Sequence, residues 1–319
     1  MPDRYNLDFE EPLKKIREQI SEMEEWSDHD PEHAQNEIKR LEEQEARMGK
    51  EIYSKLTSWQ RVQIARHPMR PHTLDYISMI MTDFIELHGD RTTGDDPAMV
   101  TGFARLDDIP VAVIGQQKGH DNETLISRNF GMSSPEGYRK ALRIMKLAEK
   151  YSRPIISFVD TTGAFPGIDA EKHGQGEAIA RNLMEMSKLR VPVIVTVIGE
   201  GGSGGALGIG VGNRIIMLEN SWYSVIAPES CAMILMRNTD KKDKLSETLK
   251  LTAEDLKKLG IIDSIVKEPL GGAHNDPEKV AGAVKKELQS ILPGLMKKSG
   301  EELASERIRK FQEMGRWSE

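Results

Sequence analysis

Residues 192–207 read Pro-Val-Ile-Val-Thr-Val-Ile-Gly-Glu-Gly-Gly-Ser-Gly-Gly-Ala-Leu, an apolar run followed by a glycine cluster. A short apolar run bounded by turn residues is typical of a β-strand buried on both faces, and such a strand needs a sheet that helices cover on each side. Glycine permits backbone conformations and close approaches that other residues resist. The sequence therefore predicts that residues 199–206 form a tight strand-to-helix loop at the end of a buried strand.

Short strands and helices follow one another around this segment in a strand-strand-helix rhythm, repeated with variations. The rhythm predicts an α/β fold, but not a simple β-α-β alternation. The predicted strands are Val100–Leu106, Pro110–Ile114, Pro154–Asp160, Pro192–Ile198, Arg214–Leu218, Trp222–Ile226 and Ile261–Val266. The predicted helices are Thr73–His88, Pro135–Tyr151, Glu171–Leu189, one starting near Pro228, Lys241–Gly260, Pro277–Leu292 and Glu301–Met314, and a long polar loop is predicted at Gln116–Ser134.

The N-terminal part differs in composition, because residues 10–56 are rich in Glu, Lys and Arg. Apolar residues at helical spacing occur before and after a break at residues 28–31: Leu13, Ile16, Ile20, Met23, Ile38, Leu41, Met48 and Ile52. This pattern predicts a helical hairpin whose narrow apolar stripe must pack on its own chain or on a partner. We therefore divide the chain into a helical hairpin (1–58), a helical connector (59–96) and an α/β domain with C-terminal helices (97–319).

Composition narrows the classes of function. The 319 residues carry a formal charge of −7 with both signs mixed, which does not favour nucleic-acid binding. A single cysteine, Cys231, lies in an apolar run and is expected to be a buried thiol; it cannot form a zinc site alone. No apolar run reaches the ~18 residues of a membrane helix, and the first ten residues lack a signal-peptide core. We expect a cytoplasmic protein that binds no membrane.

The glycine segment matches two familiar motifs whose context argues against them. As G-x-G-x-x-G, it lacks the full helix and the spacing of about 20 residues to an acidic residue that a dinucleotide site needs, since Glu219 follows too early. As G-x-S-x-G around Ser203, it needs a histidine later in the chain, and the sequence offers only His274 in a loop.

A third interpretation is an oxyanion hole. The first amides of a helix have no intrahelical partner and carry partial positive charge, so they can hold a developing negative charge without any side chain. Such donors typically contribute a few kcal/mol to a transition state. The alternative that the glycines serve only close packing stays open from the sequence alone.

Seven blocks, in the same order, are similar to the carboxyltransferase alpha subunit of bacterial multi-subunit acetyl-CoA carboxylase. They are Ala65–Pro71, Arg128–Met132, Pro135–Ala141, Asp160–Gly167, Ile198–Leu207, Tyr223–Glu229 and Glu268–His274. The resemblance implies a crotonase-type fold of ββα units in a spiral, with residues 97–319 as the carboxyltransferase domain. It also implies transfer of a carboxyl group from carboxybiotin to acetyl-CoA, giving malonyl-CoA for fatty acid biosynthesis.

The resemblance also implies the parts of the site. The backbone amides of Gly204 and Gly205 match the family's oxyanion-hole positions. The expected biotin-pocket residues are Gly201, Gly202, Ser203, Gly163, Ala164, Phe165 and Pro166. The sequence departs from the family at Thr162, where proline is usual, so that turn loses one restraint on φ.

Partners and cofactors follow from the same resemblance. Biotin would arrive on a separate carrier protein, and the catalytic base would be carried by the substrate, which fits a chain without an obvious acid/base pair. A zinc-bearing beta subunit would supply the acetyl-CoA side in an α₂β₂ heterotetramer, with biotin carboxylase in the full complex and no metal in this chain. Two alternatives remain: a crotonase-type hydratase or isomerase using Glu219 or Glu229 as its base, and a scaffold subunit without a catalytic role.

Overall fold

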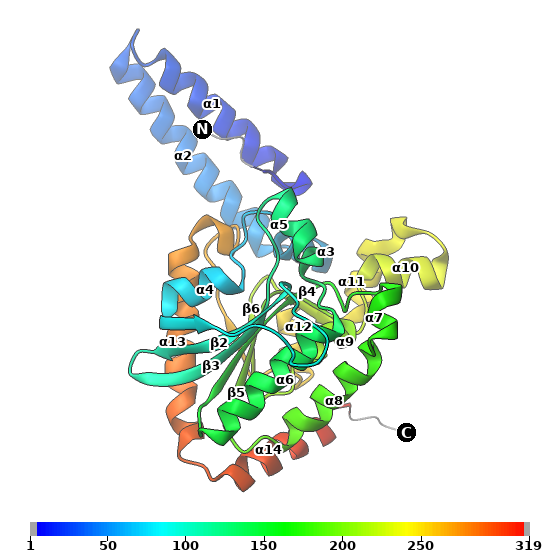
Figure 1. Cartoon of the computed structure of the whole chain (residues 1–319). Helices are drawn as coiled ribbons and strands as arrows, with labels where there is room; N and C mark the ends of the chain where they lie inside the picture. The colour runs from blue at the N-terminus through cyan, green and yellow to red at the C-terminus, as the bar shows by residue number, and fades with distance from the viewer. Residues whose placement is uncertain (1–4, 316–319) are drawn as a thin grey trace.

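A mixed β-sheet forms the centre of the computed structural model, which describes residues 5–315 (Figure 1). The strand order is β1-β2-β3-β4-β5-β6-β8, with β7 paired to the end of β5. β2 is antiparallel to both of its neighbours, β1 and β3, whereas β3, β4, β5, β6 and β8 run parallel to one another. The strands are β1 (Thr82–Glu86), β2 (Met99–Leu106), β3 (Ile109–Gln116), β4 (Ile155–Thr161), β5 (Val193–Gly202), β6 (Arg214–Leu218), β7 (Trp222–Ser224) and β8 (Ser264–Val266).

Helices surround this sheet and form the N-terminal hairpin. They are α1 (Glu11–Trp26), α2 (Pro31–Ser54), α3 (Ser58–Ala65), α4 (Thr73–Ile80), α5 (Asn122–Ser127), α6 (Pro135–Lys150), α7 (Ile168–Lys172), α8 (Gln175–Lys188), α9 (Ser203–Leu207), α10 (Pro228–Met236), α11 (Lys242–Leu249), α12 (Ala253–Lys258), α13 (Pro277–Met296) and α14 (Gly300–Gln312). The predicted strand-strand-helix rhythm is present in β2-β3-α6 and again in β6-β7-α10.

Each face of the sheet is covered by its own helices, as the apolar strands predicted. Side chains alternate between the faces along a strand: in β5, Val193 and Val195 join α6 and α8 in one core, while Ile194 joins α4 and α13 in the other. Phe158 of β4 stacks on Tyr76 of α4. Burial on both faces explains why the central strands read as nearly continuous apolar runs.

The predicted helical hairpin is present as α1 and α2, which extend away from the sheet (Figure 1). Its apolar stripe packs within the hairpin, where Leu13, Ile16 and Leu41 are buried. Arg17 and Glu45 add an ion pair of 2.5 Å between the two helices. The predicted divisions 1–58 and 97–319 extend into residues 1–4 and 316–319, which lie outside the described residues.

The predicted helix Thr73–His88 is wrong in its second half. α4 ends at Ile80, and β1 then pairs with the edge of β2. A Cβ at Gly102 of β2 would lie 2.2 Å from the carbonyl oxygen of Ile85, so glycine there lets the two strands approach. Apolar spacing fits either structure here, and the pairing with β2 decides between them.

Three other predicted elements are also corrected. The polar loop Gln116–Ser134 contains α5, whose N-cap Asp121 accepts a 2.8 Å hydrogen bond from the Thr124 amide. Two predicted helices are each split in two, at Gly174 (φ 83°) and at Lys250 (φ 52°). A left-handed residue cannot continue a right-handed helix, so each ends one helix before the next begins.

Within residues 5–315, no helix combines the length and the apolar character that crossing a membrane requires.

The C-terminal helix α14 is anchored by Arg307, whose side chain is fully buried. Its guanidinium donates hydrogen bonds to the carbonyl oxygens of Met186 (2.7 Å), Leu189 (2.9 Å) and Val191 (3.0 Å) and to the side-chain oxygen of Asn213. Burial lowers the pKa of Arg307 to about 10. One side chain thus joins α14 to the segment that links α8 with β5.

We predict that Arg307→Met lowers the free energy of unfolding by about 3 kcal/mol, because several buried acceptors lose a charged donor. Arg309→Met, on the exposed face of the same helix, is the matched control and should change stability by less than about 0.5 kcal/mol. Urea unfolding of both variants measures the difference. Equal stability of the two variants would show that Arg307 is not an anchor.

Candidate active site at the N terminus of α9

β5 passes directly into α9, without the loop predicted at residues 199–206. The strand continues to Gly202, and the helix begins at Ser203. Ser203 has a φ of 57°, a left-handed conformation that costs a residue with a Cβ about 1 kcal/mol. The change of direction is therefore concentrated in one strained residue, whose side chain is exposed.

The first residues of α9 present amides without intrahelical partners, as in any helix. Gly204 is partly exposed and Gly205 is buried. The carbonyl oxygen of Gly205 accepts hydrogen bonds from the Gln116 side chain (2.8 Å) and the Tyr138 hydroxyl (3.0 Å). These two bonds fix the peptide plane that follows Gly205, and with it the orientation of the first turn.

The end of β5 and the start of α9 touch the turn after β4 through bare backbone. A Cβ at Gly202 would lie 2.1 Å from the carbonyl oxygen of Thr162, and a Cβ at Gly205 would lie 2.3 Å from the carbonyl carbon of Gly163. A Cβ at Gly204, by contrast, would meet only Ile179, at 3.8 Å. Gly202 and Gly205 are thus required for packing, whereas Gly204 has room for a Cβ.

The predicted pocket turn, residues 163–166, is held by side chains on both sides of it. The Thr161 hydroxyl contacts both the amide (3.1 Å) and the carbonyl oxygen (2.7 Å) of Gly163. The Phe165 amide donates to the carbonyl oxygen of Ser133 at 3.0 Å, and Gln175 donates to the Phe165 carbonyl oxygen at 2.9 Å. This bonding restrains the turn where Thr162 replaces the usual proline.

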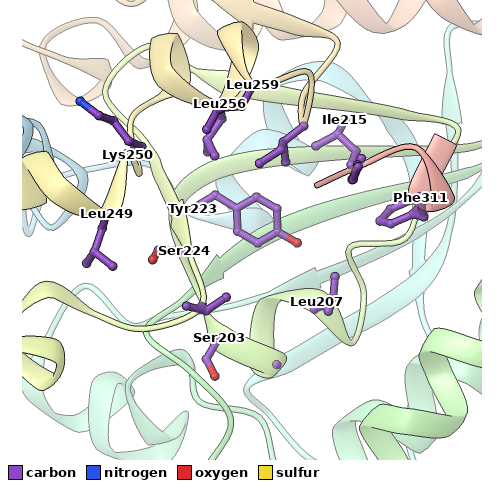
Figure 2. A pocket seen from close by; sticks show the side chains of 14 residues that line it. Ser203, Leu207, Ile215, Tyr223, Ser224, Leu249, Lys250, Leu256, Leu259 and Phe311 are labelled. Carbon is purple, nitrogen blue, oxygen red and sulfur yellow. The ribbon is translucent and has the colours of Figure 1, made fainter. Parts of the chain in front are cut away.

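A largely apolar cavity of about 500 Å³ opens beside α9. Figure 2 shows the ring of Tyr223 at its centre, with Ser203 and Leu207 on one side and Leu256 on the other. Its remaining lining comes from α9 and from residues in or just after β6, β7, α11, α12 and α14: Gly204, Ile215, Ser224, Val225, Leu249, Lys250, Leu259, Ile261, Phe311 and Met314. The exposed start of α9 therefore borders a pocket of the size that binds small molecules.

The nine predicted site residues are brought together, but only two of them line this cavity. Ser203 and Gly204 belong to its wall. Gly201, Gly202, Gly205 and the turn 163–166 pack next to them and are not part of its lining. The cavity walls from α12 and α14 were not predicted, because only the fold brings these residues, which are distant in the sequence, to α9.

The carboxylates considered as catalytic bases are occupied elsewhere. Glu219 pairs with Lys267 at 2.7 Å, and Glu229 pairs with Arg66. Neither lines the cavity, and Lys250 is the one charged residue in its lining within the part of the chain that the structure describes. Burial raises the pKa of Tyr223 to about 12, so its hydroxyl stays protonated at neutral pH.

The structure has the strand-turn-helix geometry that a serine hydrolase requires. His274, the histidine that this alternative needs, lies elsewhere. His274 stacks on His67 at a ring distance of 3.6 Å, and none of the described residues that line the cavity next to Ser203 is a histidine. Burial lowers the pKa of His274 to about 3, so the ring is neutral. Ser203 therefore lacks a base in this cavity.

A buried ionic cluster next to α9 was not singled out from the sequence. The Lys118 ammonium lies 2.8 Å from carboxylate oxygens of both Asp160 and Glu200. Arg66 also binds Glu200 (2.6 Å), and His72 binds Asp160 (2.8 Å). The sequence could have indicated this cluster, because Asp160 and Glu200 are charged residues at the ends of apolar strands.

The region has no sign of a metal centre: among residues 5–315, no group of three or more His, Cys, Asp or Glu side chains is placed to hold a metal ion. Cys231 is buried in α10, as expected for a structural thiol.

Comparisons with known proteins identify close relatives. Residues 6–315 match the family described as acetyl co-enzyme A carboxylase carboxyltransferase-like. The chain is 55% identical to the acetyl-coenzyme A carboxylase carboxyl transferase subunit alpha of Chlorobium phaeovibrioides, over 100% of this chain and 99% of the relative. It is 54% identical to the protein of the same name from a Geobacillus species, over 98% and 96% of the two chains.

Solved structures share the fold at low sequence identity. Transcarboxylase 12S aligns with a TM-score of 0.53 at 21% identity, over 66% of this chain and 40% of that chain. The beta subunit of geranyl-CoA carboxylase from P. aeruginosa aligns with a TM-score of 0.56 at 16% identity, over 76% and 46%. The predicted crotonase-type α/β architecture is thereby confirmed.

The close backbone contact generates a prediction for two neighbouring glycines. Gly205→Ala should lower the free energy of unfolding by about 3 kcal/mol, because its Cβ would overlap the backbone of Gly163. Gly204→Ala should cause no loss of stability, because its Cβ has room and alanine favours a helix. Urea unfolding compares them, and equal losses in both variants would contradict the contact.

Proposed function

Because the chain belongs to the family of acetyl-CoA carboxylase carboxyltransferase alpha subunits, we propose that it transfers a carboxyl group from carboxybiotin to acetyl-CoA, giving malonyl-CoA. One observation carries the proposal for the site itself. The start of α9 borders an apolar cavity that, among residues 5–315, has no carboxylate or histidine in its lining. Such a site is suited to stabilising charge on a substrate that brings its own base.

The backbone amides of Gly204 and Gly205 are proposed as the oxyanion hole. Carboxybiotin supplies the carboxyl group, and its ureido oxygen becomes negative when that group leaves. The first amides of α9 would hold this charge through their hydrogen bonds and the positive end of the helix. Gln116 and Tyr138 keep those amides in place by binding the Gly205 carbonyl oxygen.

The cavity beside α9 fits the apolar part of such a ligand. Its walls are mainly aliphatic and aromatic side chains, including Leu207, Leu256 and Phe311. We propose that Gly201, Gly202, Ser203 and the turn 163–166 shape the adjoining pocket and exclude water from the reacting atoms. Apolar walls strengthen any hydrogen bond to a charged oxygen, because water no longer competes for it.

The alternative of a hydratase or isomerase is disfavoured by the same lining, since Glu219 and Glu229 are held in ion pairs away from the cavity. The catalytic base is therefore proposed to arrive with the substrate.

The word "alpha" in the relatives' name supports a partner subunit. We propose an α₂β₂ heterotetramer with a zinc-bearing beta subunit that binds acetyl-CoA, served in the cytoplasm by a biotin carrier protein and biotin carboxylase. We further propose that residues 1–58 form a separate hairpin unit that engages this partner, joined by 59–96 to the carboxyltransferase domain at 97–319. The exposed hairpin in Figure 1 supports this division.

The proposed function predicts that activity requires the partner. Transfer of the carboxyl group from malonyl-CoA to biocytin should be undetectable with this chain alone and should appear when the beta subunit is added. Activity of the isolated chain would contradict a shared active site, and inactivity of the assembled complex would contradict the reaction.

Gly204→Val tests the oxyanion role against a purely scaffolding one. The larger side chain would project into the space beside the amides, and the loss of one oxyanion donor typically lowers kcat by about 10²–10³-fold. We expect such a loss in the assembled complex. Gly282→Val, at an open glycine of α13, is the matched control and should keep full activity. A Gly204→Val complex with full activity would favour the scaffold.

A further inference from the structure

We propose that Lys118 is a positioning residue for the oxyanion hole: by binding Asp160 and Glu200 together, it fixes the ends of β4 and β5 and so aims the first amides of α9. The inference rests on the proposed function, because it assigns a role to a residue that does not touch the cavity.

The parallel pairing of β4 and β5 contains a bulge next to α9. Val159 pairs with Val197, and the next pair is Thr161 with Gly201. One residue of β4, Asp160, therefore faces three residues of β5, which displaces the end of β5 from a regular ladder. A bulge redirects the strand that carries the extra residues, and here that strand leads into α9.

The Asp160 side chain occupies the space that the bulge opens. Its Oδ1 accepts a 3.0 Å hydrogen bond from the amide of Glu200, replacing a ladder bond that the bulge removes. A Cβ at Gly199 would lie 2.4 Å from this same oxygen, so the carboxylate fills the site tightly. The shape of the bulge thus depends on where the Asp160 carboxylate lies.

Two buried carboxylates side by side repel each other unless a cation binds both. Lys118 does so at 2.8 Å to each, and its side chain is almost fully buried. His72 and Arg66 each contact one of the two, so they cannot replace the link. Burial alone lowers the pKa of Lys118, but the two adjacent carboxylates raise it above its ordinary value, which keeps the ammonium charged.

The same cluster reaches α9 by a second route. The Gln116 side chain accepts a hydrogen bond from the Asp160 amide (3.1 Å) and donates one to the carbonyl oxygen of Gly205 (2.8 Å). Gln116 ends β3, and Lys118 follows two residues later. The ends of three adjacent parallel strands are therefore tied to one another and to the first turn of α9.

The experiment measures kcat and KM for malonyl-CoA in the assembled complex with biocytin. Lys118→Met should lower kcat by about 100-fold, comparable to the loss of an oxyanion donor, while KM for malonyl-CoA changes by less than about twofold. Lys140→Met is the matched control: Lys140 of α6 is also buried, and its ammonium binds the Asp95 carboxylate (2.6 Å) and the carbonyl oxygen of Asp96 (2.7 Å) instead of Asp160 and Glu200. It should lose stability but keep kcat.

Glu200→Gln is the second variant, for the case that Lys118→Met does not fold. It keeps the shape of the side chain and removes the charge, and we expect a loss of about tenfold in kcat with KM unchanged. The inference is overturned if Lys118→Met, when folded, loses no more kcat than Lys140→Met, or if Glu200→Gln has the kcat of the wild type.

Hydrogen exchange of residues 203–207 separates this inference from the proposed function. Lys118→Met should accelerate exchange of these amides relative to Lys140→Met, whatever the activity of the complex. If Lys118→Met does not fold, Glu200→Gln takes its place in this comparison. If the wild-type complex is inactive but exchange accelerates, the proposed function fails and the positioning role stands. If the wild type is active and exchange is unchanged, only the positioning role fails.

Discussion

The contact between bare backbone segments at Gly202, Gly205 and the turn after β4 is the constraint on which the site depends. No side chain can enter this contact, because added Cβ atoms would lie 2.1–2.3 Å from the backbone of Thr162 and Gly163. The contact brings the start of α9 against the end of β4, and Ser203 accepts a left-handed conformation to make the turn in one residue. Strain of this kind persists only where the surrounding structure holds it in place.

Polar side chains hold the strained turn at Ser203 in place, although the sheet around it is otherwise apolar. The two faces of the sheet pack against helices through aliphatic side chains, which stabilise the fold but do not specify a direction to within a few degrees. Direction comes from hydrogen bonds and ion pairs with fixed geometry at the strand ends. There Lys118 binds the carboxylates of Asp160 and Glu200, and Gln116 binds the Asp160 amide. The apolar layers and the polar cluster therefore contribute different properties, stability and orientation.

The parts of this fold that the sequence predicted are those with a local cause. The central strands β4 and β5 are continuous apolar runs, and Pro135 begins α6, so both kinds of element could be recognised directly. β1 was missed because Phe84 and Ile85 fit a helix as well as an edge strand until β2 is placed beside them. The break at Lys250 was missed for the same kind of reason, since a left-handed lysine has no sequence signature.

The candidate site, like the fold, has parts that the sequence could predict and parts that depend on packing between distant elements. The glycines and the turn 163–166 were expected in one pocket because of the family resemblance, and the parallel pairing of β4 with β5 places them side by side. The cavity walls from Leu256 and Phe311 could not be predicted, since only the packing of α12 and α14 brings them to α9. The ionic cluster could have been predicted from the sequence, because a charged residue that ends an apolar strand needs a partner when it is buried.

The proposed oxyanion hole is built from backbone amides, which has a further physical consequence. An amide does not titrate, so the donors of Gly204 and Gly205 keep the same charge distribution at any pH at which the protein is folded.

Burial raises the pKa of Asp160 and of Glu200, but Lys118 and their other cationic neighbours hold both pKa values below the ordinary range. Lys118 has a raised pKa, so all three groups stay charged between the ordinary pKa of a carboxylate and that of a lysine. Their contribution to stability is complete in that interval and is lost only when pH falls through the lowered carboxylate values or rises through the raised lysine value. Lys118, Asp160 and Glu200 thus keep their charges across physiological pH, as the amides keep theirs.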